Sequence, residues 1–245
     1  MLPSIAVQKV SKKIGHIDLK FQPFNVGLEN LLLIVKDSKD PKEILEAILQ
    51  IEDECLLDDW RGKAKALPSY IAEMLFIELR KVSNGTEIPI NLNCKNIIKD
   101  SSGKEKTCGT QVQSIIDLNS VKIITPEDFK DTFVIEGESK IYVKLGVLSA
   151  GEIVEDLDQI SSSTGIYKHL KSITTGDEII TKDDVSKDDL LDWINKIPLS
   201  VKADMTKHFF GKMPHIHLGI PFKCTNENCN HEHNLEFTSV LDFFI

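Results

Sequence analysis

Four of the five cysteines stand in two pairs, Cys94 with Cys108 and Cys224 with Cys229. Thiolate sulfur is a preferred ligand of zinc, and a structural zinc site needs four ligands arranged as a tetrahedron. Thirteen residues separate the first pair and four separate the second, whereas two to four are usual within one zinc-binding loop. Neither pair is strong evidence alone, so the prediction of a structural Zn2+ site rests on all four cysteines together.

Other chemistry of these cysteines stays open at the level of sequence. Four buried thiols without a metal would also fit the composition. A catalytic redox pair is disfavoured, because the chain has neither a C-x-x-C motif nor a thioredoxin-like βαβ context. A catalytic zinc ion would need an open position beside a general base, and four cysteines leave none. Cys55 lies within a predicted helix, where we expect it to be a packed core residue.

Histidines offer a further set of potential ligands. His231 and His233 follow Cys229 closely; either could replace a cysteine, but as residues of a polar turn we expect both to face solvent. His215 and His217 share one face of a predicted strand, a spacing that can bind a metal, although strand histidines more often face solvent or a neighbouring residue. The glycine after Cys108 lets backbone amides turn toward the sulfur.

Each cysteine pair stands where a predicted strand meets a loop. The first unit is a strand over 86–94, a polar loop that ends at Cys108, and an alternating stretch over 110–124. The second unit repeats this order, with a strand over 215–224, a tight loop, and a returning strand over 234–244. Two copies of one strand–loop–strand unit are therefore predicted to bring the four cysteines together.

Helical periodicity dominates the chain before the first unit. Residues 1–25 look extended and polar, as an arm or a strand would. Three amphipathic helices are predicted after them, over residues 28–37, 41–57 and 67–85. Between the two cysteine units, one β-like stretch over 139–148 accompanies predicted helices over 150–160, 163–173, 187–197 and 200–210.

These patterns predict an α+β protein in three parts. Residues 1–85 form an N-terminal arm and a helical bundle. Residues 86–124 and 214–245 form a split, four-cysteine β domain of the zinc-ribbon kind. Residues 125–213 form a mainly helical insertion carried between its two halves.

Composition restricts the function further. The chain has 245 residues, of which 41% are hydrophobic, so it can build a sizeable core. It has no apolar run long enough to span a membrane and no signal peptide, so we expect an unexported protein of a reducing cytoplasm, where thiols bind metals more often than they form disulfides. The usual phosphate-loop, dinucleotide, metalloprotease and serine-hydrolase motifs are absent, so neither an enzyme nor a small-molecule substrate is indicated.

Nucleic-acid binding is the competing hypothesis from another class. A formal net charge of −9 disfavours it. Lys99, Lys104 and Lys106 make the first loop basic, but the second loop, over 225–233, is acidic to neutral. The chain ends in the apolar run LDFFI, which is expected either to pack into the core or to dock on a partner.

The order of three segments resembles a known family. FNVGLENLLLIVKDSKDPKEILEAILQIEDECLLDD is followed by LPSYIAEMLFIELRKVSNGTEIPINLNC, and a cysteine loop and a strand ending in DFF come last. This order is similar to that of the baseplate hub proteins of T4-like contractile-tailed phages. Their LR-x-x-S-x-G-E-like motif corresponds here to Leu79, Arg80, Ser83, Gly85 and Glu87, with Thr86 as one extra residue.

The resemblance implies a non-enzymatic structural or assembly protein of the phage tail baseplate hub. Its implied partners are other baseplate hub and tail proteins. It would be made in the host cytoplasm and retained in the virion. A transient tail-assembly chaperone that leaves before the virion is complete, and a zinc-ribbon nucleic-acid-binding regulator, are the alternative hypotheses.

Overall fold

The chain begins with a β-hairpin of strands β1 (Val10–Ile14) and β2 (Ile17–Phe21). The computed structural model describes residues 6–36, 38, 40–99, 103–155 and 162–244. Gly15 has a φ of 57° in the hairpin turn, a backbone conformation that suits glycine. Leu19 and Phe21 alternate toward the core and are buried. The helices are therefore not the first elements, as the prediction of an N-terminal helical bundle had it: strands lead, and the segment 1–25, expected to be an arm or a strand, contains a paired hairpin.

Three helices follow the hairpin: α1 (Val26–Lys36), α2 (Pro41–Cys55) and α3 (Ser69–Asn84). Asp40 caps α2, because its side chain accepts a hydrogen bond from the backbone of Lys42. Gly85 ends α3 with a φ of 85°. The three predicted helices are thus present within a few residues of their expected limits. Two 3-10 turns, Asp58–Trp60 and Ala64–Ala66, lie between α2 and α3. A third, Leu118–Ser120, lies in the β-rich segment that follows α3.

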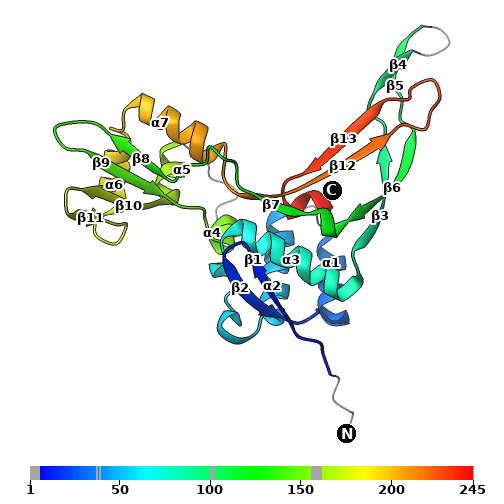
Figure 1. Ribbon diagram of the computed structural model, residues 1–245, viewed down its shortest axis with the longest axis horizontal. Helices are drawn as coiled ribbons and strands as arrows, with labels where there is room; N and C mark the ends of the chain where they lie inside the picture. Colours follow the sequence, from blue (N-terminus) through cyan, green and yellow to red (C-terminus); the bar gives the residue numbers. More distant parts are fainter. Residues whose placement is uncertain (1–5, 37, 39, 100–102, 156–161, 245) are drawn as a thin grey trace.

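Two long β-ribbons rise from the helices and approach each other at their far ends (Figure 1). Strand β3 pairs with β6, β4 pairs with β5, and β12 lies between β13 and β7, all antiparallel. The strands are β3 (Glu87–Asn93), β4 (Ile97–Lys99), β5 (Glu105–Thr107), β6 (Gln111–Asp117), β7 (Lys122–Ile124), β12 (His215–Lys223) and β13 (Glu232–Phe237).

Two details of the ribbons differ from the prediction. The loop predicted over 95–107 contains the short hairpin β4–β5. The returning strand predicted over 234–244 ends at Phe237, and a 3-10 helix, η5 (Val240–Phe244), follows it. Val240 is fully buried there, and Phe244 packs against the core near Phe76. The described part of the apolar C-terminus therefore packs on the protein itself.

Residues 125–213 contain a four-stranded antiparallel sheet in the order β11-β10-β9-β8. The expectation of a mainly helical insertion with one β-like stretch therefore left out most of this sheet: helices are present, but strands β8, β10 and β11 accompany the expected stretch. The elements are β8 (Thr132–Ile135), β9 (Ile141–Leu145), α4 (Ala150–Glu155), α5 (Ser162–His169), β10 (Leu170–Thr175), β11 (Glu178–Ile180), α6 (Lys187–Ile194), α7 (Leu199–Met205) and a π-helical turn (Thr206–Phe210).

The segment 163–173, for which one helix is expected, is divided between a helix and a strand. Its helix ends at His169, and the next residues form β10, which pairs with both β9 and β11. Leu170 and Ile173 are buried in the hydrophobic core between this sheet and its helices, so tertiary packing decides the structure where local periodicity favoured a helix. Residues 156–160 of the helix predicted over 150–160 lie outside the described residues.

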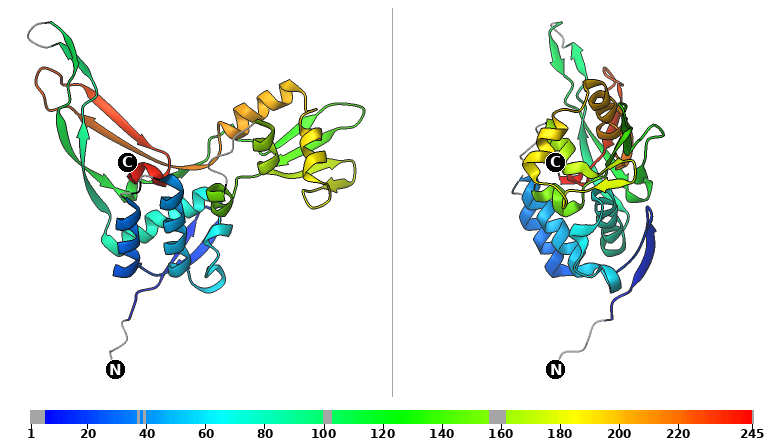
Figure 2. Two further views of the ribbon diagram at one scale, coloured as in Figure 1. Left: turned by 180° about the vertical axis from the view of Figure 1, so that it is seen from behind. Right: turned by 90° about the vertical axis from the view of Figure 1, so that its left-hand side faces the viewer.

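Two hydrophobic cores are present. The first joins the hairpin, α1–α4, the bases of the ribbons and η5. The second lies between the four-stranded sheet and helices α5–α7. Figures 1 and 2 show these two bodies side by side, with the ribbons projecting from the first. The domain boundaries at residues 85, 124 and 213 stay a prediction.

Within the described residues, no helix combines the length and the apolar character needed to cross a membrane.

Candidate metal centre

The sulfur atoms of Cys94, Cys108, Cys224 and Cys229 all lie within 4.8 Å of one another. Two of the separations are 3.7 Å, from Cys94 to Cys229 and from Cys108 to Cys224. Four sulfurs around a zinc ion, each at about 2.3 Å, would be about 3.8 Å apart along the edges of the tetrahedron. The donor set and its spacing therefore fit a tetrahedral thiolate site.

Each ribbon delivers one buried cysteine. Cys94 follows β3 and Cys224 follows β12, and both side chains are about 1% exposed. The backbone N–H of Cys94 donates to the carbonyl of Thr110 at 2.9 Å, and that of Cys224 donates to the carbonyl of His231 at 2.9 Å. In both cases the acceptor lies two residues after the second cysteine of the pair. The two loops therefore share one backbone hydrogen-bond pattern.

The second cysteine of each pair is also held in the same way. Cys108 donates its N–H to the carbonyl of Asn96 at 2.8 Å, and Cys229 donates to that of Asn226 at 2.9 Å. The residue after each of these cysteines has a left-handed backbone, with φ of 68° at Gly109 and 47° at Asn230. Glycine and asparagine are the residues that tolerate this conformation best. Gly109, expected to let the backbone turn in the first loop, and Asn230 in the second loop therefore occupy equivalent positions.

Side-chain amides connect the two loops crosswise. Asn96 Nδ2 donates to Cys229 Sγ at 3.4 Å, and Asn226 Nδ2 donates to Cys108 Sγ at 3.5 Å. Hydrogen bonds of this kind orient metal-binding sulfurs and spread their negative charge. The sequence reasoning missed both asparagines. The repeated motif C-x-N, found as CKN at 94–96 and CTN at 224–226, is the signal that identifies them.

The four thiols differ in how easily they lose a proton. A hydrogen bond with the Thr110 hydroxyl, 3.1 Å from Cys108 Sγ, is the main cause that lowers the pKa of Cys108 to about 6. The Asn96 amide lowers the pKa of Cys229. Burial raises the pKa of Cys94 to about 12. A divalent cation would favour the thiolate form at every position, because metal binding displaces the thiol proton.

His233 touches this cluster, although it was expected to face solvent. Its Nε2 lies 3.1 Å from Cys94 Sγ. The imidazole ring stacks on Phe222, with centroids 4.6 Å apart and an interplanar angle of 12°. That expectation is therefore wrong for His233, which is half-buried, and holds for His231, which is exposed. His233 belongs with the asparagines, as a residue that contacts a sulfur.

The remaining candidates lie elsewhere. His215 Nδ1 is 3.0 Å from the carbonyl of Met213, and the cluster found among the described residues includes neither His215 nor His217. Cys55 is buried in the first hydrophobic core, as predicted. Burial raises the pKa of its thiol to about 12, which makes it unreactive.

This arrangement suits a structural role. The cluster joins two ribbons that are over a hundred residues apart in sequence, and it does so at the ends far from the first core (Figure 1). Two-stranded ribbons are marginally stable on their own. Four sulfur ligands also complete a tetrahedron and leave no position for a substrate.

Comparisons with known proteins place the chain in a family. Neither the curated proteins nor the solved structures gave a match. The sequence model described as T4 bacteriophage base plate protein matches residues 4–245, which is nearly the whole chain. The chain therefore belongs to the T4 bacteriophage base plate protein family.

Proposed function

We propose that this chain is a non-enzymatic structural protein of the phage tail baseplate hub that binds other hub subunits. The observation that carries the proposal is the family match over residues 4–245. Membership of a baseplate family favours a role in building the tail. The choice of the hub within the baseplate rests on the similarity of the N-terminal helical segments and the cysteine loops to hub proteins.

In this proposal Cys94, Cys108, Cys224 and Cys229 hold a structural Zn2+. The sulfur separations of 3.7 Å support it, since they are close to the edge of a zinc–thiolate tetrahedron. The bound metal would fix the two ribbons against each other as one rigid body. A rigid pair of ribbons presents a defined surface to neighbouring subunits, because little conformational entropy is lost on binding.

A mass-spectrometric inventory of purified virions tests the proposal. The expected result is that the protein is present at a fixed copy number in particles and co-purifies with hub subunits from infected cells. Absence from particles, combined with failure of tail formation when the gene is disrupted, would favour the transient assembly chaperone instead. Salt-sensitive binding to random DNA at micromolar protein concentration would favour the nucleic-acid-binding regulator.

A further inference from the structure

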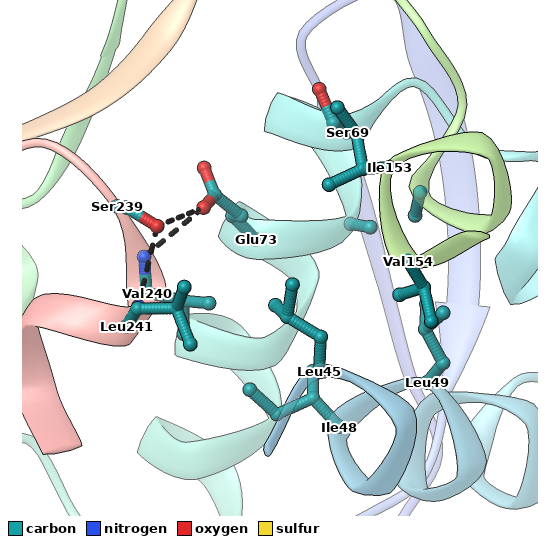
Figure 3. Close-up of a pocket in the computed structure, with 12 residues that line it drawn as sticks. Leu45, Ile48, Leu49, Ser69, Glu73, Ile153, Val154, Ser239, Val240 and Leu241 are labelled. Atoms are coloured by element: carbon teal, nitrogen blue, oxygen red, sulfur yellow. Dashed lines mark hydrogen bonds between the residues drawn. The ribbon is translucent and has the colours of Figure 1, made fainter. Parts of the chain in front are cut away.

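An apolar pocket of about 110 Å³ opens between helices α2, α3, α4 and η5 (Figure 3). Val240 of η5 and the preceding Ser239 stand at one end, and Ile153 and Val154 of α4 stand at the other. Its lining is Leu45, Ile48, Leu49, Ser69, Ala72, Glu73, Ala150, Ile153, Val154, Ser239, Val240 and Leu241. It lies in the helical body and is separate from the cysteine cluster.

The size and lining of the pocket indicate which apolar group it can hold. Nine of the twelve lining residues are apolar. Dry apolar cavities of roughly 150 Å³ bind benzene-sized molecules. A pocket of about 110 Å³ is therefore suited to a branched aliphatic group of the size of a leucine or isoleucine side chain.

Glu73 indicates which polar group the ligand would carry beside its apolar part. Its Oε1 accepts hydrogen bonds from the hydroxyl of Ser239 at 2.6 Å and from the N–H of Val240 at 3.1 Å. Within the described part of the chain, Oε2 accepts no hydrogen bond, and Figure 3 shows it pointing away from η5. A carboxylate oxygen at the edge of an apolar pocket is a position for a cation or a hydrogen-bond donor.

The surroundings of Glu73 are mainly acidic. Glu52, one turn beyond Ile48 on α2, is fully buried, and neither of its carboxylate oxygens has a hydrogen-bond partner among the described residues. Burial raises the pKa of Glu73, the nearby Asp242 raises it further, and His215 lowers it; the charge of Glu73 in turn helps to keep Glu52 protonated. A cation at Glu73 Oε2 would relieve this repulsion.

We propose that the pocket is a docking site for a segment of another protein in which a branched aliphatic residue stands beside a lysine or arginine. The aliphatic side chain fills the pocket, and the cation pairs with Glu73 Oε2. An aliphatic anchor in a preformed pocket, with a charged partner at the rim, is a common arrangement of interface hot spots. The identity of the partner as another tail protein rests on the proposed function.

The negative charge of Glu73 and of the whole chain favours a basic occupant of the pocket over a fatty acid or a second copy of the chain. A fatty acid would place its carboxylate beside Glu73, where like charges repel. A second copy of the chain carries the same net charge of −9, which opposes self-association. A basic segment of a different chain is attracted by both the local and the overall charge.

Three small probes of one shape separate the apolar and the charged contributions: 3-methylbutylammonium, 3-methylbutanol and 3-methylbutanoate. Methyl NMR spectra of the full-length protein report on the lining residues Leu45, Ile48 and Ile153. The ammonium probe is expected to shift these resonances and to bind about tenfold more tightly than the alcohol, which corresponds to ~1.4 kcal/mol. The carboxylate is expected to bind most weakly.

Glu73→Gln keeps an oxygen acceptor for Ser239 and Val240 and removes the charge. It should abolish the preference for the ammonium probe and leave binding of the alcohol unchanged. Glu46→Gln is the matched control, because Glu46 is exposed on α2 and does not line the pocket. The methyl spectrum also shows whether each variant is folded.

Equal binding of the three probes, tighter binding of the carboxylate, or shifts confined to other parts of the protein would overturn the proposal. A dimer in sedimentation velocity that Glu73→Gln dissociates would replace the separate partner with a second copy. All these measurements use purified protein. Failure of probe binding therefore counts against the docking site alone, whereas absence from virions counts against the proposed function and the choice of a tail protein as partner, and leaves probe binding untouched.

Discussion

Asn96 and Asn226 stand in equivalent positions, and each donates its side-chain amide to a cysteine of the opposite loop. The acceptors are Cys229 Sγ at 3.4 Å and Cys108 Sγ at 3.5 Å. The backbone carbonyl of each asparagine also accepts a hydrogen bond from the backbone N–H of the second cysteine in its own loop. One residue type therefore shapes its own loop and contacts the sulfur of the other, so the two halves of the cluster depend on each other.

Asn96→Ala and Asn226→Ala are each expected to weaken zinc binding about tenfold or more, because residues that orient metal ligands typically contribute a factor of 10–100 to affinity. One zinc per chain should still bind at saturation. Competition with a chromophoric chelator measures the affinity. Asn228→Ala is the control, since Asn228 is exposed in the same loop and contributes its backbone N–H, which alanine keeps, to the hydrogen bond with Asn226 Oδ1. An unchanged affinity in both variants would show that the amides are dispensable.

The sequence predicts those parts of the candidate metal centre that depend on neighbouring residues along the chain. Alternating residues lead into Cys94 and Cys224, so the strands that deliver them are visible before folding. The crosswise contacts of Asn96 and Asn226 are not, because they join residues 133 and 118 positions apart. His233 was misjudged for the same reason: its exposure depends on Phe222 of the neighbouring strand and on a sulfur from the other ribbon.

The fold shows the same division between local and distant causes. Helices α2 and α3 have caps and a clear apolar face, and they lie where the periodicity puts them. Strands β10 and β11 have six and three residues and become strands only by pairing within the sheet. Such short segments carry too few residues for a period of two to be distinguished from a helical one.

His233 should act through its contact with Cys94 and not as a fifth ligand. His233→Phe keeps a ring to stack on Phe222 and removes the nitrogen 3.1 Å from the sulfur. The variant is expected to bind one zinc with an affinity lowered several-fold, as other residues around metal ligands do when changed. His231→Phe, at an exposed position in the same loop, should leave the affinity unchanged. Loss of stoichiometric zinc in His233→Phe would instead make the histidine a ligand.

Replacing one of the four clustered cysteines should remove zinc, whereas replacing Cys55 should not. Purified wild-type protein is expected to contain one zinc per chain by elemental analysis, and a chelator should lower its melting temperature, because metal-binding energy contributes to folding. Cys224→Ser should reduce the zinc content and the melting temperature together.

Cys55→Ser provides the comparison in the helical core. It should keep one zinc and lose about 1–3 kcal/mol of stability, since it places a hydroxyl in a site that is about 1% exposed. Wild-type protein with substantially less than one zinc and four titratable native thiols would contradict the metal centre itself.

Glu52 should make the protein less stable as the pH rises. Burial raises its pKa well above the ordinary value, and the charges of Asp53 and Glu73 add to the effect. Between the unfolded pKa of about 4.3 and the raised folded pKa, the native state holds a proton that the unfolded state has lost. The native state thus binds more protons, so the free energy of unfolding falls with increasing pH over this range.

Glu52→Gln removes this titration and is expected to raise the free energy of unfolding at pH 8 by on the order of 1 kcal/mol, the usual size of a single-residue effect. Urea unfolding at a series of pH values from 5 to 8 measures both the gain and the flattened slope. A residual slope should remain from Glu73, whose pKa burial also raises. Glu46→Gln, exposed on the same helix, should keep the wild-type slope. If Glu52→Gln also kept that slope, the carboxyl group of Glu52 would have to be ionised inside the native protein, and a cation from outside the described residues would be needed to hold it there.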